Sequence, residues 1–209
     1  MKIREMVQEY RSENAWDKLL RIKTTGRDDT GANNVRYAYE PTPYSVLERL
    51  AVSNLIGKKN TLLDYGAGKG RVSFFLAYET GCRTLGVEIN ERLYEKALKN
   101  QETAVSASKT TFFLQDAASF DIPGTVDRVF FFNPFSLTIL RPVMGRLKQS
   151  WKENPREILL FFYFPAMEYV GYLMQDALLE FEDEIDTSDL FYENPRREKI
   201  LIFKLPGNR

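Results

Sequence analysis

One short glycine-rich segment has the residue types and spacing that best fit ligand chemistry: Asp64-Tyr65-Gly66-Ala67-Gly68-Lys69-Gly70. An apolar run over residues 61–64 precedes the glycines, and a helical pattern begins at Arg71. Glycine lets the backbone approach a ligand at points where any Cβ atom would collide with it. In open α/β sheets, ligands bind beyond the carboxyl ends of the strands. The segment therefore predicts a binding site for a nucleotide-like cofactor.

Three more polar side chains stand where predicted strands end. Glu88 closes the run 84–88, Asp116 follows the run 110–114, and Asn133 follows the continuous apolar run 128–132. Parallel strands present their carboxyl ends at the same edge of a sheet, so we expect these residues to surround one cleft with the glycine segment.

An alternation of strands and helices must position these residues. We expect strands over residues 61–64, 84–88, 110–114, 128–132 and 157–164, and helices over 71–80 and 91–101, near Pro142 and after Pro165. This order is typical of a parallel sheet with right-handed crossovers. No helical pattern separates the last two strands, 178–186 and 199–205, so they should be antiparallel. The prediction is an α/β sandwich with a mostly parallel seven-stranded sheet, one antiparallel strand near its edge, and helices on both faces.

The amino-terminal part has a different character. Residues 1–24 have roughly helical spacing, and residues 25–40 form a long polar loop, a type that in compact domains tends to be functional or disordered. Thr42 and Pro43 predict the start of a helix that runs to about residue 56. We therefore divide the chain into an extension with a lid loop, 1–41, and a main domain, 42–209.

Composition excludes several kinds of chemistry. The chain has no histidine and one cysteine, Cys82, which rules out histidine-based triads, histidine metal sites and thiolate zinc sites. Lys plus Arg and Asp plus Glu number 29 each, so nothing favours a nucleic acid partner, and we expect none. No apolar run has the length of a signal peptide or membrane span, and the single cysteine fits a reducing compartment. We expect a cytoplasmic protein that binds no membrane and no metal.

From about residue 42 to 205 the chain resembles the class I, Rossmann-like S-adenosylmethionine-dependent methyltransferases, in particular uncharacterised bacterial members with an Asn-Pro-Phe motif. The resemblance implies S-adenosyl-L-methionine as cofactor. Asp64 and the glycine backbone would contact its methionine part, Glu88 both ribose hydroxyls, and Asp116 the adenine edge. The residues that this resemblance places at the cofactor are Asp64, Tyr65, Gly66, Ala67, Gly68, Gly70, Glu88, Ile89, Asp116, Ala117 and Asn133.

The resemblance also implies a catalytic segment, Asn133-Pro134-Phe135. It is similar to the Asn-Pro-Pro-aromatic signature of methyltransferases that act on amines, although one proline is missing here. An Asn side-chain carbonyl and the next backbone carbonyl can accept two N–H bonds and aim a nitrogen lone pair at the methyl group. Positioning of this kind can supply roughly 7–11 kcal/mol of a reaction barrier. We therefore expect a nitrogen acceptor, on a small-molecule amine or a protein side chain.

Tyr39 and Tyr44 lie in or just after the lid loop. Either ring could cover the cofactor and favour its sulfonium cation, or could instead attach the amino-terminal helices to the core. Lys69 and Arg71, in and after the glycine segment, could reach a carboxylate, but we expect them to be solvated.

Two other functions stay open at this point. A methyltransferase fold could serve as a non-catalytic S-adenosylmethionine-binding scaffold or regulatory subunit, because fold does not fix function. An NAD(P)-dependent oxidoreductase would share the first strand–helix–strand unit, but its fingerprint is G-x-G-x-x-G and the spacing here is G-x-G-x-G.

Overall fold

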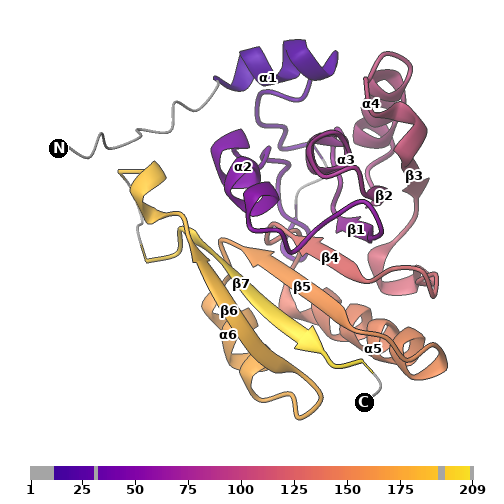
Figure 1. The fold of residues 1–209 in the computed structure, drawn as a ribbon, viewed down its shortest axis with the longest axis vertical. Helices are drawn as coiled ribbons and strands as arrows, with labels where there is room; N and C mark the ends of the chain where they lie inside the picture. Colours follow the sequence, from indigo (N-terminus) through magenta and orange to yellow (C-terminus); the bar gives the residue numbers. More distant parts are fainter. Residues whose placement is uncertain (1–11, 31–32, 193–195, 208–209) are drawn as a thin grey trace, which may run out of the picture.

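The structure is a computed structural model, and it describes residues 12–30, 33–192 and 196–207. At the centre of this described part lies one sheet with the strand order β3-β2-β1-β4-β5-β7-β6 (Figure 1). The strands are β1 (Thr61–Tyr65), β2 (Arg83–Glu88), β3 (Thr110–Leu114), β4 (Arg128–Phe131), β5 (Ile158–Tyr163), β6 (Glu180–Asp186) and β7 (Lys199–Leu205).

Strand direction in the sheet agrees with the sequence prediction. Strands β1 to β5 pair in parallel, and β7 pairs antiparallel with both β5 and β6. The predicted fold, a mostly parallel sheet with one antiparallel strand near its edge, is therefore confirmed. The chain crosses from one half of the sheet to the other between β3 and β4, so β1 and β4 are neighbours. Such a reversal opens a crevice at the carboxyl ends of the two strands.

Helices cover both faces of the sheet. They are α1 (Glu13–Leu20), α2 (Tyr44–Val52), α3 (Arg71–Glu79), α4 (Glu91–Gln101), α5 (Leu137–Glu153) and α6 (Met167–Met174), with short 3-10 turns η1 (Ala107–Lys109), η2 (Ala117–Ser119) and η3 (Ser188–Leu190). Side chains alternate between the faces of a strand. In β1, for example, Leu62 packs into the cluster under α1 to α4, whereas Leu63 packs into the cluster under α5 and α6.

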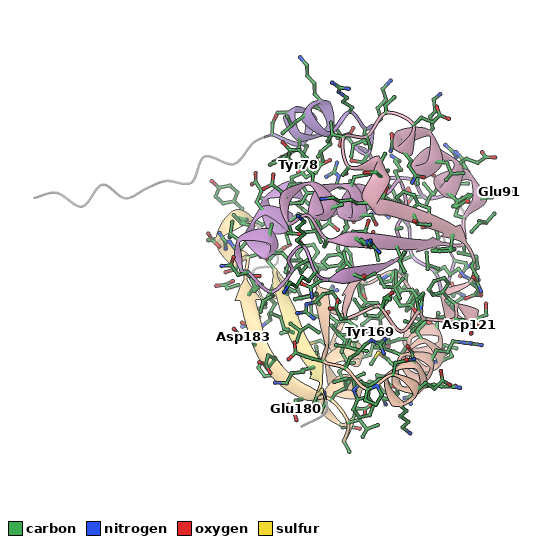
Figure 2. All side chains as sticks on the ribbon, turned by 45° about the vertical axis from the view of Figure 1, so that its right-hand side comes forward. Tyr78, Glu91, Asp121, Tyr169, Glu180 and Asp183 are labelled. Atoms are coloured by element: carbon green, nitrogen blue, oxygen red, sulfur yellow. The ribbon has the colours of Figure 1, made fainter. Side chains whose placement is uncertain are left out.

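The exposed edge of the sheet is acidic. In β6, Glu180, Glu182, Asp183 and Glu184 are all exposed, and Figure 2 shows Glu180 and Asp183 at the outer margin, whereas Tyr169 of α6 lies inside. Charged side chains on an edge strand discourage pairing with another chain. No helix in the described ranges is both long and apolar enough to cross a membrane.

Helix α2 is shorter than the sequence predicted. It begins at Tyr44, after Pro43, and the Glu13 carboxylate accepts the Tyr44 amide hydrogen at 2.9 Å. A side chain from α1 therefore caps the helix, in place of Thr42. It ends at Val52 because Asn54 has a left-handed φ of 62°, which interrupts the helix before the predicted end near residue 56.

Arg71 fastens the amino-terminal segment to the main domain. It is 1 % exposed, which contradicts the expectation of a solvated charge. Its Nε donates to Thr24 Oγ1 at 2.7 Å, its Nη1 donates to the Thr42 carbonyl and to the Glu13 carboxylate, and its guanidinium lies 4.2 Å from the centre of the Tyr44 ring. A buried guanidinium needs such partners because leaving it without them costs several kcal/mol.

Asp17 completes this buried cluster. Its carboxylate accepts hydrogen bonds from the Thr24 amide, the Thr24 hydroxyl and the Tyr44 hydroxyl, each at 2.6 Å. It lies 3.9 Å from Arg71 Nη2. These contacts join α1, the residues after it and the start of α2 to Arg71 at the start of α3.

Arg71→Met should lower the free energy of unfolding by about 3–5 kcal/mol, because it leaves the Asp17 carboxylate buried without its cation. Urea unfolding followed by circular dichroism measures the change. The control is Lys199→Met, which removes a half-exposed ion pair with Glu184 and should cost no more than about 1 kcal/mol. Equal effects of the two substitutions would contradict a special role for the buried cluster.

Candidate active site

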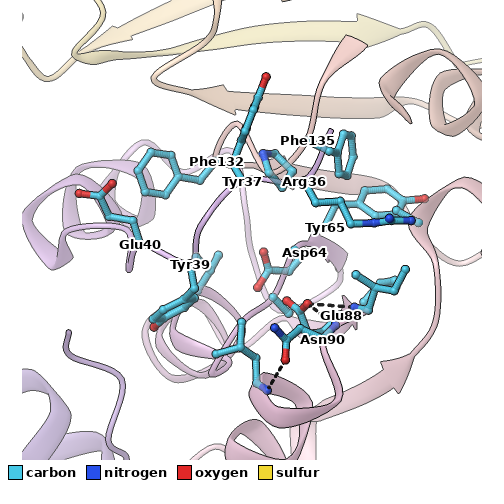
Figure 3. Close-up of a pocket in the computed structure, with 18 of the residues that line it drawn as sticks. Arg36, Tyr37, Tyr39, Glu40, Asp64, Tyr65, Glu88, Asn90, Phe132 and Phe135 are labelled. Carbon is cyan, nitrogen blue, oxygen red and sulfur yellow. Dashed lines mark hydrogen bonds between the residues drawn. The ribbon is translucent and has the colours of Figure 1, made fainter. Parts of the chain in front are cut away.

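A cavity lies beyond the carboxyl ends of β1, β2 and β4, at the predicted crevice (Figure 3). Its floor comes from the strand ends, and its cover comes from the loop that follows α1. The side chains and backbone that line it include Tyr37, Tyr39, Glu40, Asp64, Tyr65, Gly66, Ala67, Glu88, Ile89, Asn90, Asp116, Ala117, Phe132, Pro134 and Phe135.

The first glycine of the loop lies where the backbone must come close to another segment. Gly66 has a φ of 74°, and a Cβ atom there would lie 2.7 Å from Pro134 Cβ. The Gly66 and Ala67 amides donate to the Val87 carbonyl at 2.9 and 3.1 Å. These contacts join the ends of β1, β2 and β4 around the cavity.

The other two glycines lie against side chains of the protein itself, and their contact with the cofactor stays a prediction. A Cβ on Gly68 would lie 2.2 Å from the Tyr39 ring, and a Cβ on Gly70 would lie 2.7 Å from both Phe74 and Phe112. Neither glycine lines the cavity. Gly68 allows Tyr39 to lie on the loop, and Gly70 allows α3 to pack on β3.

Glu88 holds the turn after β2. Its Oε1 accepts hydrogen bonds from the Ile89 and Asn90 amides at 2.9 and 2.8 Å, and its Oε2 accepts one from the Gly68 amide at 2.8 Å. The carboxylate therefore links β2 to the glycine loop and still faces the cavity.

Asp64 and Glu88 make the cavity acidic. They are 2 % and 7 % exposed, and neither has a cationic side chain within ion-pair distance in the described residues. Burial raises the pKa of Asp64 to about 7, against a smaller opposing effect of the Ser73 hydroxyl, which donates to Asp64 Oδ2 at 3.0 Å. Burial also raises the pKa of Glu88. Two buried carboxyl groups of this kind favour a ligand that brings positive charge and hydrogen-bond donors.

Asp116 combines two roles at the rim. Its Oδ1 accepts the Ala118 amide at 2.9 Å and caps η2, and its Oδ2 accepts from Arg36 Nη2 at 2.8 Å. The helix cap was the alternative to a cofactor contact, and the structure shows both the cap and a position on the cavity wall. The Arg36 pair connects the covering loop to this rim.

The covering segment, residues 24–30 and 33–43, is attached to the main domain at several points. The Tyr37 amide donates to the Pro134 carbonyl at 3.2 Å, and the Ser136 amide donates to the Val35 carbonyl at 2.9 Å. Asp28 accepts from Lys96 Nζ at 2.9 Å. Each attachment reaches a loop or helix next to a strand end, so the segment lies across the cavity.

Lys69 holds the near end of the covering segment, and the expectation that it is solvated is wrong. Its Nζ donates to the Thr25 and Gly26 carbonyls at 2.8 and 3.1 Å, and it lies 4.7 Å from the centre of the Tyr39 ring. Burial lowers the pKa of this ammonium group.

The two candidate tyrosines have different positions. Tyr39 lines the cavity, lies on Gly68, and donates its hydroxyl hydrogen to the Thr24 carbonyl at 2.7 Å. Tyr44 does not line the cavity. It is fully buried in the cluster around Arg71 and Asp17, so its placement at the cofactor needs correction in favour of the structural alternative.

The residues of the Asn133-Pro134-Phe135 segment line two different cavities. Pro134 and Phe135 line the first, whereas Asn133 lines a second cavity of about 490 Å³ that shares Tyr37, Ala38, Glu40, Pro41 and Phe132 with the first. Asn133 has a left-handed φ of 42°, and its side-chain Oδ1 atom has no hydrogen-bond partner among the described residues. Its Oδ1 atom is buried, which makes the missing partner costly.

Several residues at the two cavities were not predicted from the sequence. In the first, Arg36, Tyr37 and Glu40 come from the covering segment. In the second, Phe164 follows β5, and Arg197 and Glu198 precede β7. The strand-end rule could have found Phe164, because residues 157–164 were predicted as a strand. The pattern contained no signal for Arg197 and Glu198.

Asp64→Asn should make the unfolding free energy depend less on pH. Because the folded protein keeps a proton on Asp64 up to about pH 7, it binds more protons than the unfolded chain above about pH 4. Stability therefore falls as pH rises through this window, and the variant should be the more stable protein at pH 8. Urea unfolding at pH 5 and pH 8 tests this. Asp183→Asn, on the exposed edge, should behave as wild type, and an unchanged slope in Asp64→Asn would contradict the prediction.

The effects of Gly68→Ala and Tyr39→Ala on the free energy of unfolding should not be additive. In wild type the new Cβ meets the Tyr39 ring, which should add about 1–3 kcal/mol of overpacking to the ~1–2 kcal/mol cost of a left-handed alanine. In the Tyr39→Ala background only the second cost should remain. A double-mutant cycle by urea unfolding measures the difference, and costs that add within about 0.5 kcal/mol would refute the contact.

Comparisons with known proteins agree with this geometry. Residues 62–153 match the profile of a family described as a methyltransferase domain. A search of curated proteins found no match. Among solved structures, an RNA methyltransferase from Salinibacter ruber with S-adenosyl-L-homocysteine is similar at 20 % identity and a TM-score of 0.56, over 81 % of this chain and 96 % of that chain.

Two further structures give the same result. A SAM-dependent methyltransferase from Thiobacillus denitrificans with S-adenosyl-L-homocysteine has 15 % identity and a TM-score of 0.55, over 86 % of this chain and 96 % of that one. A TehB-like SAM-dependent methyltransferase from Corynebacterium glutamicum has 16 % identity and a TM-score of 0.55, over 78 % and 88 %. The family match over residues 62–153 and the fold shared with these structures agree with the predicted resemblance to class I, Rossmann-like S-adenosylmethionine-dependent methyltransferases.

Proposed function

We propose that this methyltransferase transfers a methyl group from S-adenosyl-L-methionine, bound in the first cavity, to a nitrogen atom of an acceptor in the second. One observation carries the choice of nitrogen. The Asn133 amide lies at the second cavity with a buried, unpaired Oδ1 and a left-handed backbone. A buried carbonyl without a partner is suited to accept an N–H bond from an acceptor amine.

The first cavity fits the donor by charge. S-adenosylmethionine carries a sulfonium and an ammonium group, and the cavity presents Asp64 and Glu88 without cationic partners in the described residues. Glu88 would hold the ribose hydroxyls, and Asp116 and Ala117 would lie at the adenine end. Tyr65, Gly66, Ala67 and Ile89 would contribute the remaining walls.

The cover must shift for the whole donor to enter. The first cavity measures about 110 Å³, whereas small-molecule sites usually have roughly 300–1,000 Å³. Tyr39 is the aromatic side chain of the cover that lies on the glycine loop, so its displacement would enlarge the cavity next to Asp64. After closure, its ring would face the bound cation.

The chemistry needs no further protein nucleophile. The donor supplies an electrophilic methyl group, and the acceptor nitrogen supplies the electron pair for the new N–C bond while sulfur keeps the pair of the broken C–S bond. The chain's own part is to hold the nitrogen, exclude water and orient both molecules, which is where much of the acceleration arises. Asn133 and the adjacent backbone carbonyl would hold the acceptor N–H groups.

The acceptor is proposed to be a small-molecule amine or an amino group of a protein, as the balanced charge of the chain suggests. One similar structure is named as an RNA methyltransferase, so RNA belongs in the set of acceptors to be tested. A non-catalytic scaffold would bind the donor and methylate nothing.

Asn133→Ala should reduce methyl transfer about 100-fold and leave donor affinity within a few-fold, because it removes an acceptor contact and no donor contact. Calorimetric titration with S-adenosylmethionine, S-adenosylhomocysteine and NADH measures affinity. Transfer of labelled methyl groups to a panel of amines, proteins and RNA measures activity.

Asn54→Ala is the matched control, because Asn54 has a similar left-handed backbone, with a φ of 62°, and lines neither cavity. Full activity of Asn133→Ala would refute the role of Asn133, and loss of donor binding would move Asn133 to the donor site. Binding of NADH alone would overturn the proposed cofactor. Donor binding with no methylation of any acceptor by the wild type would favour the scaffold.

A further inference from the structure

The second cavity combines aromatic side chains with charged ones. Its lining includes Tyr37, Phe132, Tyr163, Phe164 and Phe191. The Phe132 and Tyr163 rings pack 4.7 Å apart at neighbouring strand ends, so one wall is a continuous aromatic surface. Its volume of about 490 Å³ is within the range of small-molecule sites. A small ligand with a flat apolar body fits such walls.

Backbone strain marks the same cavity. In the described residues, non-glycine left-handed φ angles occur at Arg21, Asn54, Asn133 and Phe164. Two of these four, Asn133 and Phe164, line the second cavity, each just beyond the end of its strand. For a bulky residue such as phenylalanine this conformation is costly, and such costs cluster at functional sites.

Arg197 supplies a cation that forms no ion pair with any described carboxylate. Its guanidinium lies 4.0 Å from the centre of the Phe164 ring, and its Nη2 donates to the Phe164 carbonyl at 3.1 Å. Its Nε is buried without a hydrogen-bond partner, and no described carboxylate lies within ion-pair distance of it. Phe164 thus holds the Arg197 guanidinium at the cavity wall, where its Nε–H group has no hydrogen-bond partner among the described residues.

Glu198 supplies the opposite charge. It is 9 % exposed, its Oε2 accepts the Tyr163 hydroxyl hydrogen at 2.8 Å, and no described cation forms an ion pair with it. Burial raises the pKa of this carboxyl group, whereas Tyr163 and Arg197 act in the opposite direction. The other lining charges, Arg27 and Glu40, lie 4.0 Å from each other and are 62 % and 61 % exposed, so water and mutual attraction satisfy them.

We propose that the acceptor is a small zwitterion with an aromatic body, of the aromatic amino acid class. Arg197 binds its carboxylate and the aromatic side chains contact its ring. Glu198 attracts its ammonium group and accepts the proton that the nitrogen must lose before its electron pair can attack the methyl group. This inference rests on the proposed function, because it assigns the methyl acceptor of that site. It goes further in naming the acceptor's charges and the two residues that select them.

Three probes that differ by one charged group test the inference: L-phenylalanine, phenethylamine, which lacks the carboxylate, and 3-phenylpropionate, which lacks the amine. They are titrated calorimetrically into protein saturated with S-adenosylhomocysteine. L-Phenylalanine should bind about 10-fold or more tightly than either analogue, because each analogue leaves one buried charge without a partner. Equal or tighter binding of phenethylamine, or no binding of any probe, would overturn the proposal.

Two substitutions assign the charges. Arg197→Met should abolish the preference for L-phenylalanine over phenethylamine, and Glu198→Gln should abolish the preference over 3-phenylpropionate. Lys199→Met, whose ammonium pairs with Glu184 outside the cavity, should change neither. Unchanged preferences in Arg197→Met and Glu198→Gln would refute their roles. Retained S-adenosylhomocysteine affinity shows that each variant is folded, and failure of the wild type to bind S-adenosylhomocysteine would refute the proposed function instead.

Discussion

The buried cation of Arg71 determines how the amino-terminal segment and the glycine loop fit together. A guanidinium in this position must be surrounded by oxygen atoms, and these come from Glu13, Thr24 and Thr42. The segment that supplies them continues directly into the cover of the first cavity. Lys69 uses the same principle, with backbone carbonyls as partners. Both cations therefore have partners in the amino-terminal segment, and neither forms an ion pair with Asp64 or Glu88.

This separation of charge explains the acidity of the first cavity. Asp64 and Glu88 are buried within one crevice, and the nearest cations of the loop are committed to the covering segment. Placing two carboxylates together without a cation costs stability, and the raised pKa values of both groups reflect this cost. A cationic donor would recover part of it on binding. The two carboxyl groups would thus lower the stability of the free protein and raise its affinity for a cationic donor.

Local sequence patterns predicted the sheet because parallel strands are continuous apolar runs with little ambiguity. The run 110–114 and the run 199–205 matched their strands residue for residue. The sequence patterns also predicted the strand-end residues Asp64, Glu88 and Asp116, which the topology brings to one cavity. The site residues that the patterns did not predict depend on contacts between distant segments. Arg36 meets Asp116 across 80 positions, and Arg71 meets Glu13 across 58, so composition gives no hint of either.

The same reasoning explains why glycine spacing alone did not predict the neighbours of Gly68 and Gly70. A glycine can indicate that another group lies close to the backbone. The sequence alone does not show whether that group is a ligand or a side chain. For Gly66 the neighbour is Pro134 at the cavity, whereas for Gly68 it is Tyr39 and for Gly70 the Phe74 and Phe112 rings. Only the folded chain identifies the neighbour.

Strain is distributed unequally between the two cavities, and this difference bears on their roles. Around the first cavity, left-handed φ angles fall on glycines, which adopt them at little cost. At the second, they fall on Asn133 and Phe164, where each costs of order 1–3 kcal/mol. Phe164 also orders its surroundings, since its carbonyl accepts from Arg197 and its amide donates to the Lys199 carbonyl. A donor shared by a large family can be held by a standard loop, but an individual acceptor requires side chains aimed in directions that relaxed strand ends do not provide. Under the proposed assignment of the second cavity to the acceptor, the strained residues Asn133 and Phe164 would aim such side chains.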